Sequence, residues 1–347
     1  MRGVSAQILE FGAPTTGVHW VDERALFARG DGAITISDER TIKAHDGAIL
    51  CSALAPDGAH ILTGGDDGRL MMTGLGGAPH ELLQIKGKWI DHVVASAASR
   101  VIAAAIGKEA HILKEDAPLH VFTYPSTIGG LALDAKGRRL AASHYGGATL
   151  RYALMADDAG VALKWAGSHL AIALEPQAEF VITAMQELEL HGWRVSDKKD
   201  LRMSGYAAKT RNFSWDRRGR WLATSGADCA VLWPFVGKMG PQGKPPLLLG
   251  RREALATRVA FHPREEIVAI GYADGAVLIA DIAENATAEI IAPTGVPIAA
   301  LAWSAVRMQL AAGDEAGRAH VMELQARARP VPVTSESDET GKDGPIL

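Results

Sequence analysis

The stretch Ile42–Met72, IKAHDGAILCSALAPDGAHILTGGDDGRLMM, decides the fold of this 347-residue chain. It contains three short apolar segments, separated by a Pro-Asp-Gly turn at 56–58 and a Gly-Asp-Asp-Gly turn at 65–68. Short apolar segments bounded by Gly and Asp turns are typical of strands joined as antiparallel hairpins. The stretch therefore predicts three consecutive strands of one sheet.

The same plan recurs along the chain, in the segments 18–37, 91–113, 128–154, 169–193, 211–233, 256–282 and 298–324. A large residue stands before the first turn of each unit, and these anchors are Trp20, Leu54, Val94, Leu133, Leu174, Trp215, Phe261 and Trp303. The anchors are separated by 34, 40, 39, 41, 41, 46 and 42 residues. A period near 40 with about four short strands per unit indicates a β-propeller. Helical repeats fit poorly, because Gly or Pro interrupts most windows that could carry a helical apolar stripe.

At these residues the chain resembles the WD40 repeat family. The match is best at Ala44-His45, at Ala55-Pro56-Asp57-Gly58 and at Gly64-Gly65-Asp66-Asp67-Gly68, and it recurs at Phe261-His262-Pro263 with Ala273-Asp274-Gly275. The family's Trp-Asp ending is missing, and Leu232-Trp233-Pro234 comes nearest to it. The resemblance implies that His45 and Asp67 form the family's structural His–Asp pair.

Eight anchors predict an all-β fold, a single propeller of eight four-stranded blades, with seven blades as the alternative. In a WD40-like ring the N-terminal strand, expected at Ala6–Phe11, pairs with Arg318–Leu324 of the last blade and removes both exposed edges. We expect the propeller to span residues 5–324. The remainder, 325–347, is polar, contains proline and lacks periodicity, so it is predicted to be a disordered tail.

Composition limits the function classes. The chain has 36 Lys+Arg and 40 Asp+Glu, a formal charge of −4, which gives no global electrostatic case for nucleic acid or an anionic membrane. Two cysteines, Cys51 and Cys229, exclude a disulfide framework. The N-terminus has no apolar core of a secretory signal, and no apolar stretch approaches the ~18–20 residues of a membrane span. We therefore expect a cytoplasmic protein.

The sequence contains no common catalytic motif: G-x-S-x-G, a phosphate-binding P-loop, H-E-x-x-H and C-x-x-C are all missing. We predict no catalytic residues, no cofactor and no metal. The alternative is a ring of possible ligands around the central channel, near the starts of innermost strands, formed by His19, His92 and His169 with Asp91 and Cys51.

We letter the four strands of each blade a to d from the channel outward. The loops that lead from strand d to the next strand a, and the turns from b to c, then lie on one face of a propeller, the top. This places a rim of candidate partner-binding residues there: Tyr145, Tyr206, Lys209, Arg211, Arg251, Arg252, Arg258 and Tyr272. Arginine and tyrosine are typical anchors of protein interfaces, and an arginine-bearing rim suits a carboxylate- or phosphate-bearing partner.

The sequence thus favours a non-catalytic, monomeric scaffold that presents loops to one or more proteins, with no membrane or nucleic-acid partner. Two alternatives remain open. One is an enzyme or small-ligand or metal binder that uses the channel. The other is association with RNA or nucleoprotein through a basic patch beside the insertion at 234–246, formed by Arg217, Arg218, Arg220, Lys238 and Lys244.

Overall fold

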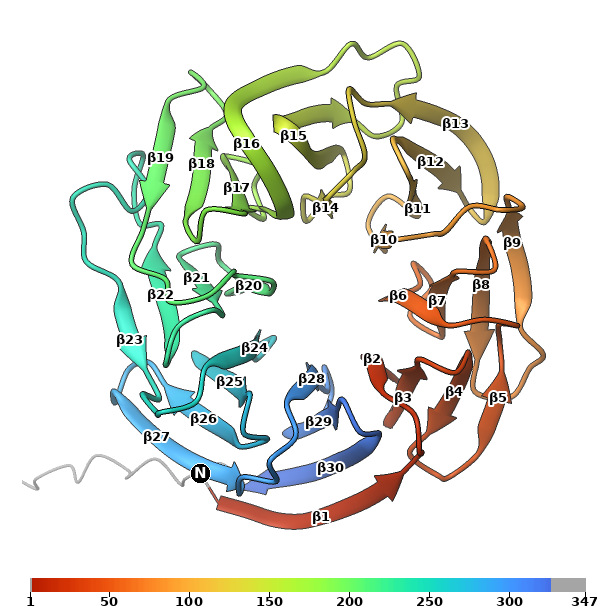
Figure 1. The fold of residues 1–347 in the computed structure, drawn as a ribbon, viewed down its shortest axis with the longest axis vertical. Helices are drawn as coiled ribbons and strands as arrows, with labels where there is room; N and C mark the ends of the chain where they lie inside the picture. Colours follow the sequence, from red (N-terminus) through yellow and green to blue (C-terminus); the bar gives the residue numbers. More distant parts are fainter. Residues whose placement is uncertain (1, 326–347) are drawn as a thin grey trace, which may run out of the picture.

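The protein is a ring of β-sheets around a central channel (Figure 1), and the computed structural model describes residues 2–325. The described residues form 30 strands in seven antiparallel sheets. This confirms the prediction of an all-β fold with a single β-propeller. Within residues 2–325 there is no helix of the length and apolar character that crossing a membrane requires.

Six sheets have four strands each, and the innermost strand of each faces the channel. In five of these sheets the four strands follow one another along the chain. The first three sheets are β2 (Thr15–Val21), β3 (Arg24–Arg29), β4 (Ala33–Ile36) and β5 (Thr41–Lys43); β6 (Ile49–Leu54), β7 (His60–Gly65), β8 (Arg69–Gly74) and β9 (His80–Gln84); and β10 (His92–Ser96), β11 (Val101–Ile106), β12 (Glu109–Lys114) and β13 (Ala117–Thr123). The other two are β20 (Phe213–Trp215), β21 (Trp221–Thr224), β22 (Ala230–Pro234) and β23 (Leu247–Leu249); and β24 (Ala256–Phe261), β25 (Ile267–Tyr272), β26 (Val277–Asp281) and β27 (Ala286–Ile291). The sixth joins both ends of the described chain: β28 (Ile298–Trp303), β29 (Gln309–Asp314), β30 (Arg318–Gln325) and β1 (Arg2–Glu10).

The seventh sheet has six strands, and it corrects the predicted blade number. Its order is β14 (Gly130–Leu133), β15 (Arg139–Tyr152), β16 (Val161–Leu174), β17 (Phe180–Met185), β18 (Leu190–Arg194) and β19 (Asp200–Met203). The units anchored at Leu133 and Leu174 share this sheet, because β15 and β16 each run unbroken for 14 residues. When each hydrogen-bonded sheet is counted as one blade, the ring has seven blades. The expectation of eight blades is not supported, and the alternative of seven is.

The N-terminal strand closes the ring, as the sequence predicted. β1 pairs antiparallel with β30, in a register that runs from Arg2 opposite Gln325 to Glu10 opposite Arg318. Phe11 N–H then donates to the carbonyl of Gly317 (2.8 Å), so the contact extends beyond the strand. Closure pairs the outer edge of β30, which would otherwise be open to other chains. The predicted disordered tail lies outside the described residues, except for Gln325 at the end of β30.

Neighbouring blades pack face to face, and the anchor residues link them. The Trp20 indole N–H on β2 donates to the carbonyl of Ala302 on β28 (2.9 Å), and the Trp303 indole N–H donates to Ala260 on β24 (2.9 Å). Middle strands such as β11 (VIAAAI) are buried along their whole length, because another sheet covers each face. Many of their residues are alanines, which let adjacent sheets approach closely.

Glycines shape the b–c turns. Gly68 has a φ of +77°, a left-handed conformation that strains any other residue, and an added Cβ there would lie 2.2 Å from the carbonyl oxygen of Ile85. The turn can therefore approach the segment that leads into β10. That segment is part of the top face of the ring.

Candidate functional site

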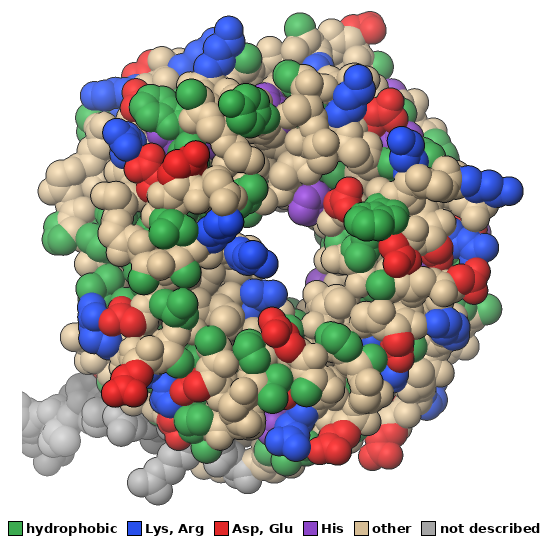
Figure 2. Space-filling view, viewed as in Figure 1, with side chains coloured by type: hydrophobic (Ala, Val, Ile, Leu, Met, Phe, Trp, Pro, Cys, Tyr) green, Lys and Arg blue, Asp and Glu red, His purple; other side chains and the backbone are tan. Residues whose placement is uncertain are grey.

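Eight strands that border the channel, with the residues just before some of them, line a cavity of about 500 Å³ at the top of the channel. Its lining is contributed by β2, β6, β10, β14, β16, β20, β24 and β28 or their entry segments. We call this region the channel mouth. Figure 2 shows the opening, with Lys and Arg side chains gathered on one side over β20 and β24. The mouth has the size of a small-ligand pocket.

The cationic side of the mouth is formed by Arg211, just before β20, and Arg258, on β24. Arg258 is half-buried, and its guanidinium donates from Nε to the carbonyl of Ala299 (2.5 Å) and from Nη1 to its neighbour Thr257 (2.9 Å). Burial lowers the pKa of Arg258 and the positive charge of Arg211 lowers it further, against an opposing effect of Glu315. Among the described residues, no carboxylate forms an ion pair with either arginine.

Asn212 fixes the spacing of the two arginines. Its Oδ1 accepts a hydrogen bond from the backbone N–H of Val259, at 2.6 Å. The backbone N–H groups of Arg211 and Asn212 in turn donate to Ser225 Oγ, at 3.4 and 3.3 Å. The segment that carries Arg211 is thus held against both β24 and the end of β21.

The opposite side of the mouth carries neutral polar groups, with Asp91 next to one of them, His92. His19 Nε2 lies 2.8 Å from Ser52 Oγ, and burial lowers the pKa of His19 to about 4. Burial also lowers the pKa of His92, although the neighbouring Asp91 opposes it, and raises the pKa of the Cys51 thiol to about 12. No carboxylate within residues 2–325 bonds to the other ring nitrogen of His19, so the pair with Ser52 is a dyad and not a triad.

The proposed ring of metal ligands is not brought together. His169 is buried beside the channel, with Nδ1 2.7 Å from Thr183 Oγ1 and Nε2 3.1 Å from the carbonyl of Trp165. Across the part of the chain that the structure describes, no three His, Cys, Asp or Glu side chains are grouped to hold a metal ion.

Two residues of the predicted rim lie in the core, and their expected exposure is wrong. The Tyr206 hydroxyl lies 2.7 Å from Thr224 Oγ1 and accepts the Trp233 indole N–H at 2.7 Å. The Tyr272 side chain is fully buried and its hydroxyl donates to the carbonyl of Gly250. Both rings fill space between blades, and burial raises the pKa of each hydroxyl. Neither is available to a partner.

The remaining rim residues differ in what they contact. Arg251 pairs with Asp228, and Arg252 pairs with both Asp274 (3.0 Å) and Glu289 (2.7 Å). Lys209 has no ion pair within residues 2–325 and is half-buried. Tyr145 is 70% exposed on β15, and its backbone N–H donates to Ser126 Oγ (2.9 Å). Of the predicted rim, Lys209, Arg211, Arg258 and Tyr145 remain as groups that a partner could contact.

One exposed residue was missed by the sequence analysis. Trp89 is 62% exposed, in the segment 85–91 that leads from β9 into β10. The next residue, Ile90, donates its N–H to the carbonyl of Gly65 (3.1 Å), which holds this segment beside the b–c turn at the top. The available signal was a tryptophan directly after the polar turn Lys86-Gly87-Lys88, because an aromatic residue beside a loop is a candidate interface anchor.

The His45–Asp67 contact implied by the family resemblance is present. His45 is buried, with Nδ1 3.0 Å from Asp67 Oδ1 and Nε2 2.9 Å from Thr63 Oγ1. Asp67 also accepts the backbone N–H groups of Asp46 and Arg69 (both 3.1 Å). Burial raises the pKa of Asp67, but these hydrogen bonds outweigh it and the pKa is lowered overall. The network fixes the b–c turn of this blade to the start of β6.

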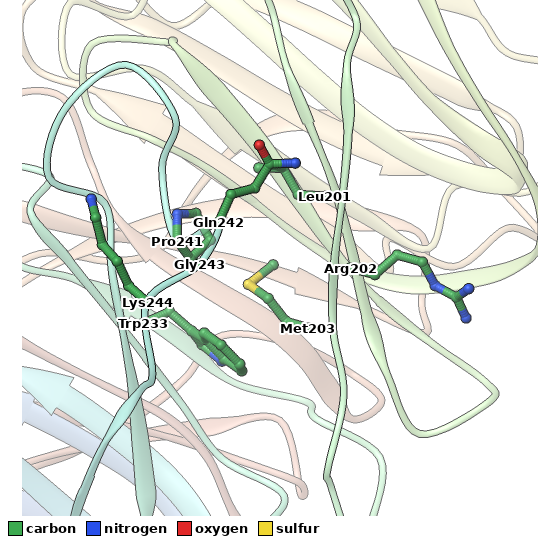
Figure 3. Close-up of a pocket in the computed structure, with 8 residues that line it drawn as sticks. All are labelled: Leu201, Arg202, Met203, Trp233, Pro241, Gln242, Gly243 and Lys244. Atoms are coloured by element: carbon green, nitrogen blue, oxygen red, sulfur yellow. The ribbon is translucent and has the colours of Figure 1, made fainter.

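The basic patch near the insertion is dispersed. Arg220 pairs with Glu266, and Lys244 donates to the carbonyls of Val236 and Gly240, which leaves Arg217, Arg218 and Lys238 as exposed cations. Beside the insertion lies a second cavity of about 500 Å³, between β19 and the segment Pro241–Lys244. Its lining includes Leu201, Met203 and Trp233, with the insertion across from them (Figure 3).

Comparisons with known proteins agree with this architecture. The family model for the WD domain, G-beta repeat, matches residues 37–72, the segment that contains His45 and Asp67. A crystal structure of the computationally designed Ika8 protein is similar over 91% of this chain and 98% of that chain, with a TM-score of 0.74 and 15% sequence identity. The comparison with curated proteins finds no match. The chain is a β-propeller, and its repeat around His45 and Asp67 matches the WD40 family model.

Proposed function

We propose that this protein is a non-catalytic scaffold for protein–protein interaction, and that its partner binds at the channel mouth. WD40 propellers are generally interaction scaffolds, and the family match supports this class of function. Because a fold alone does not fix a function, the proposal depends on the residues of the top face. The cytoplasmic location and the monomeric state expected from the sequence stay predictions.

The observation that carries the proposal is the exposed Trp89 beside the mouth. A tryptophan with 62% of its surface in water leaves a large apolar area unburied, and tryptophan is the residue most enriched at the energetic centres of interfaces. Tyr145, also largely exposed, lies on β15 two residues beyond Ser143, which pairs with Gly130 at the mouth. Arg211 adds a cation without an ion pair in the described chain. Tryptophan, tyrosine and arginine together match the composition of interface anchors.

Affinity capture from the native source with matched bait variants tests the proposal. We expect Trp89→Ala to reduce the recovery of a specific partner by about 10-fold or more, because truncation of an aromatic interface anchor costs ~2 kcal/mol or more. Val306→Ala is the control, since Val306 is a largely exposed apolar residue in the β28–β29 turn, on the opposite face. If every captured protein is recovered equally with the two baits, the channel mouth is not the interaction site.

A further inference from the structure

The arginines at the channel mouth differ from most of the other described arginines in this chain. Several exposed arginines elsewhere are paired, since Arg251 contacts Asp228, Arg307 contacts Glu23 and Arg318 contacts Glu10, whereas Arg217 and Arg218 at the other end of β20 are not. Arg211 and Arg258 have no such partner in the described chain, although they are close enough for one charge to lower the pKa of the other. Two neighbouring like charges in a partly desolvated cavity repel each other, and an anion placed between them relieves that repulsion.

Hydrogen-bond donors on both arginines remain free to bind such an anion. A guanidinium has five N–H donors, and the two bonds of Arg258 to the carbonyls of Ala299 and Thr257 orient its planar group while leaving the other donors available. Arg211 is exposed and its side chain has no hydrogen-bond partner in the described chain. The two groups line the same cavity.

A third donor, the Asn212 amide, belongs to a residue that lines the same cavity. The backbone N–H of Val259 is a donor, so the Asn212 atom that lies 2.6 Å from it must be the amide oxygen. The NH₂ group of Asn212 therefore does not contact Val259. No described residue accepts a hydrogen bond from this NH₂ group, and Asn212 itself lines the mouth. Arg211, Asn212 and Arg258 therefore offer donors to one region from two adjacent blades.

The charge distribution of the mouth confines an anion to this side. On the opposite side Asp91 is adjacent to His92, and the low pKa values of His19 and His92 keep both imidazoles neutral at neutral pH. Figure 2 shows Asp or Glu, His and hydrophobic side chains there, across the opening from the Lys and Arg side chains. Glu315 attracts Arg258 from a distance but forms no ion pair with it.

We infer that Arg211, Asn212 and Arg258 form a binding site for a doubly charged phosphate group. A dianion neutralises both guanidinium groups, whereas a single carboxylate would leave one of them without a counter-ion. The group could belong to a free phosphorylated small molecule or to a phosphorylated side chain of the protein partner. The second source rests on the proposed scaffold function, and the site itself does not.

Calorimetric titration of the full chain with pyrophosphate, at constant ionic strength, tests the site. We expect saturable binding with one site per chain. Arg211→Met should weaken it by about 10-fold or more, the expected effect of removing a charge-assisted hydrogen bond. Arg218→Met is the matched control, because Arg218 is an exposed arginine without an ion pair in the turn at the other end of β20, and it should bind like the unaltered chain.

Two results would overturn the inference: no saturable binding by the unaltered chain, or equal weakening by Arg211→Met and Arg218→Met. Arg258→Lys provides a second test, since it keeps the charge but loses the planar fork, and we expect weaker binding with an unchanged melting temperature. Trp89→Ala should bind pyrophosphate normally. If the capture experiment fails but the pyrophosphate titrations give the expected results, only the scaffold proposal is rejected.

The source of the phosphate is decided separately. Phosphatase treatment of the native extract before capture should abolish partner recovery if the phosphate is on the partner. Unchanged recovery, together with pyrophosphate binding that depends on Arg211, would assign the site to a free phosphorylated small molecule.

Discussion

Deletion of residues 1–12 is expected to lower the melting temperature of the whole ring by about 10 °C or more. The deletion removes β1 and with it the antiparallel pairing to β30. It also removes Phe11, whose ring lies 5.4 Å from that of Phe27 and whose carbonyl accepts a hydrogen bond from Arg29 Nη2 (3.1 Å). Lost burial of Leu9 and Phe11 costs roughly 4 kcal/mol, and each lost ladder hydrogen bond adds ~1 kcal/mol.

Single substitutions in β1 separate closure from a general effect of truncation. Leu9 is 6% exposed and packs in the cluster that joins the last blade to the first, whereas its neighbour Ile8 is 57% exposed. Leu9→Ala should destabilise by about 3 kcal/mol and Ile8→Ala by less than about 0.5 kcal/mol. Thermal denaturation measures both, and an unchanged melting temperature after the deletion would contradict closure by β1.

The second large effect expected is a loss of stability as the pH falls from about 6.5 towards 4. His191 is fully buried, with its ring stacked on Trp165 at 4.0 Å and edge-on to Trp193 at 4.7 Å. Neither ring nitrogen has a hydrogen-bond partner among residues 2–325, and burial lowers the pKa of His191 to about 4. An unfolded chain, with a histidine pKa near 6.5, therefore binds more protons than the folded chain throughout this window.

Because the folded pKa is the lower one, the contribution of His191 is complete above pH 6.5 and decreases as the pH falls to about 4, by roughly 3 kcal/mol in total. His19, whose pKa burial also lowers to about 4, acts in the same direction. Chemical denaturation between pH 4 and 7 measures the dependence. His191→Phe should flatten it, while His80→Phe, at an exposed histidine, should leave it unchanged. Equal profiles for the two variants would contradict this assignment.

The sequence predicted the ring well because its signals are local. Apolar segments, Gly/Asp turns and the anchors near every fortieth residue report strands that pair with their sequence neighbours. Closure was predictable for a different reason, since the propeller arrangement leaves one unpaired edge and one spare strand. The blade number was not predictable, because no local pattern shows whether the turns at Gly146-Gly147 and near Gly167 separate two sheets or let β15 and β16 run through.

The candidate site was predicted less well, because exposure depends on contacts between segments far apart in sequence. Tyr206 and Tyr145 were both expected on the rim, yet Tyr206 contacts Thr224 and Trp233 and is buried, whereas Tyr145 is exposed on β15. Arg251 and Arg211 are both loop arginines, but only Arg251 has a carboxylate, Asp228, within reach in the described chain. Trp89 was missed for the converse reason, since the anchors had suggested that large apolar residues belong to the core.

Hydrogen exchange of the full chain, with and without the captured partner, shows whether the partner binds at the channel mouth. We expect slower exchange at 89–93, 211–213 and 257–259, the entry segments and strand starts of the mouth, and no change at 236–246 beside the outer cavity. Protection confined to 236–246 or to the outermost strands, with the mouth unchanged, would contradict binding at the mouth.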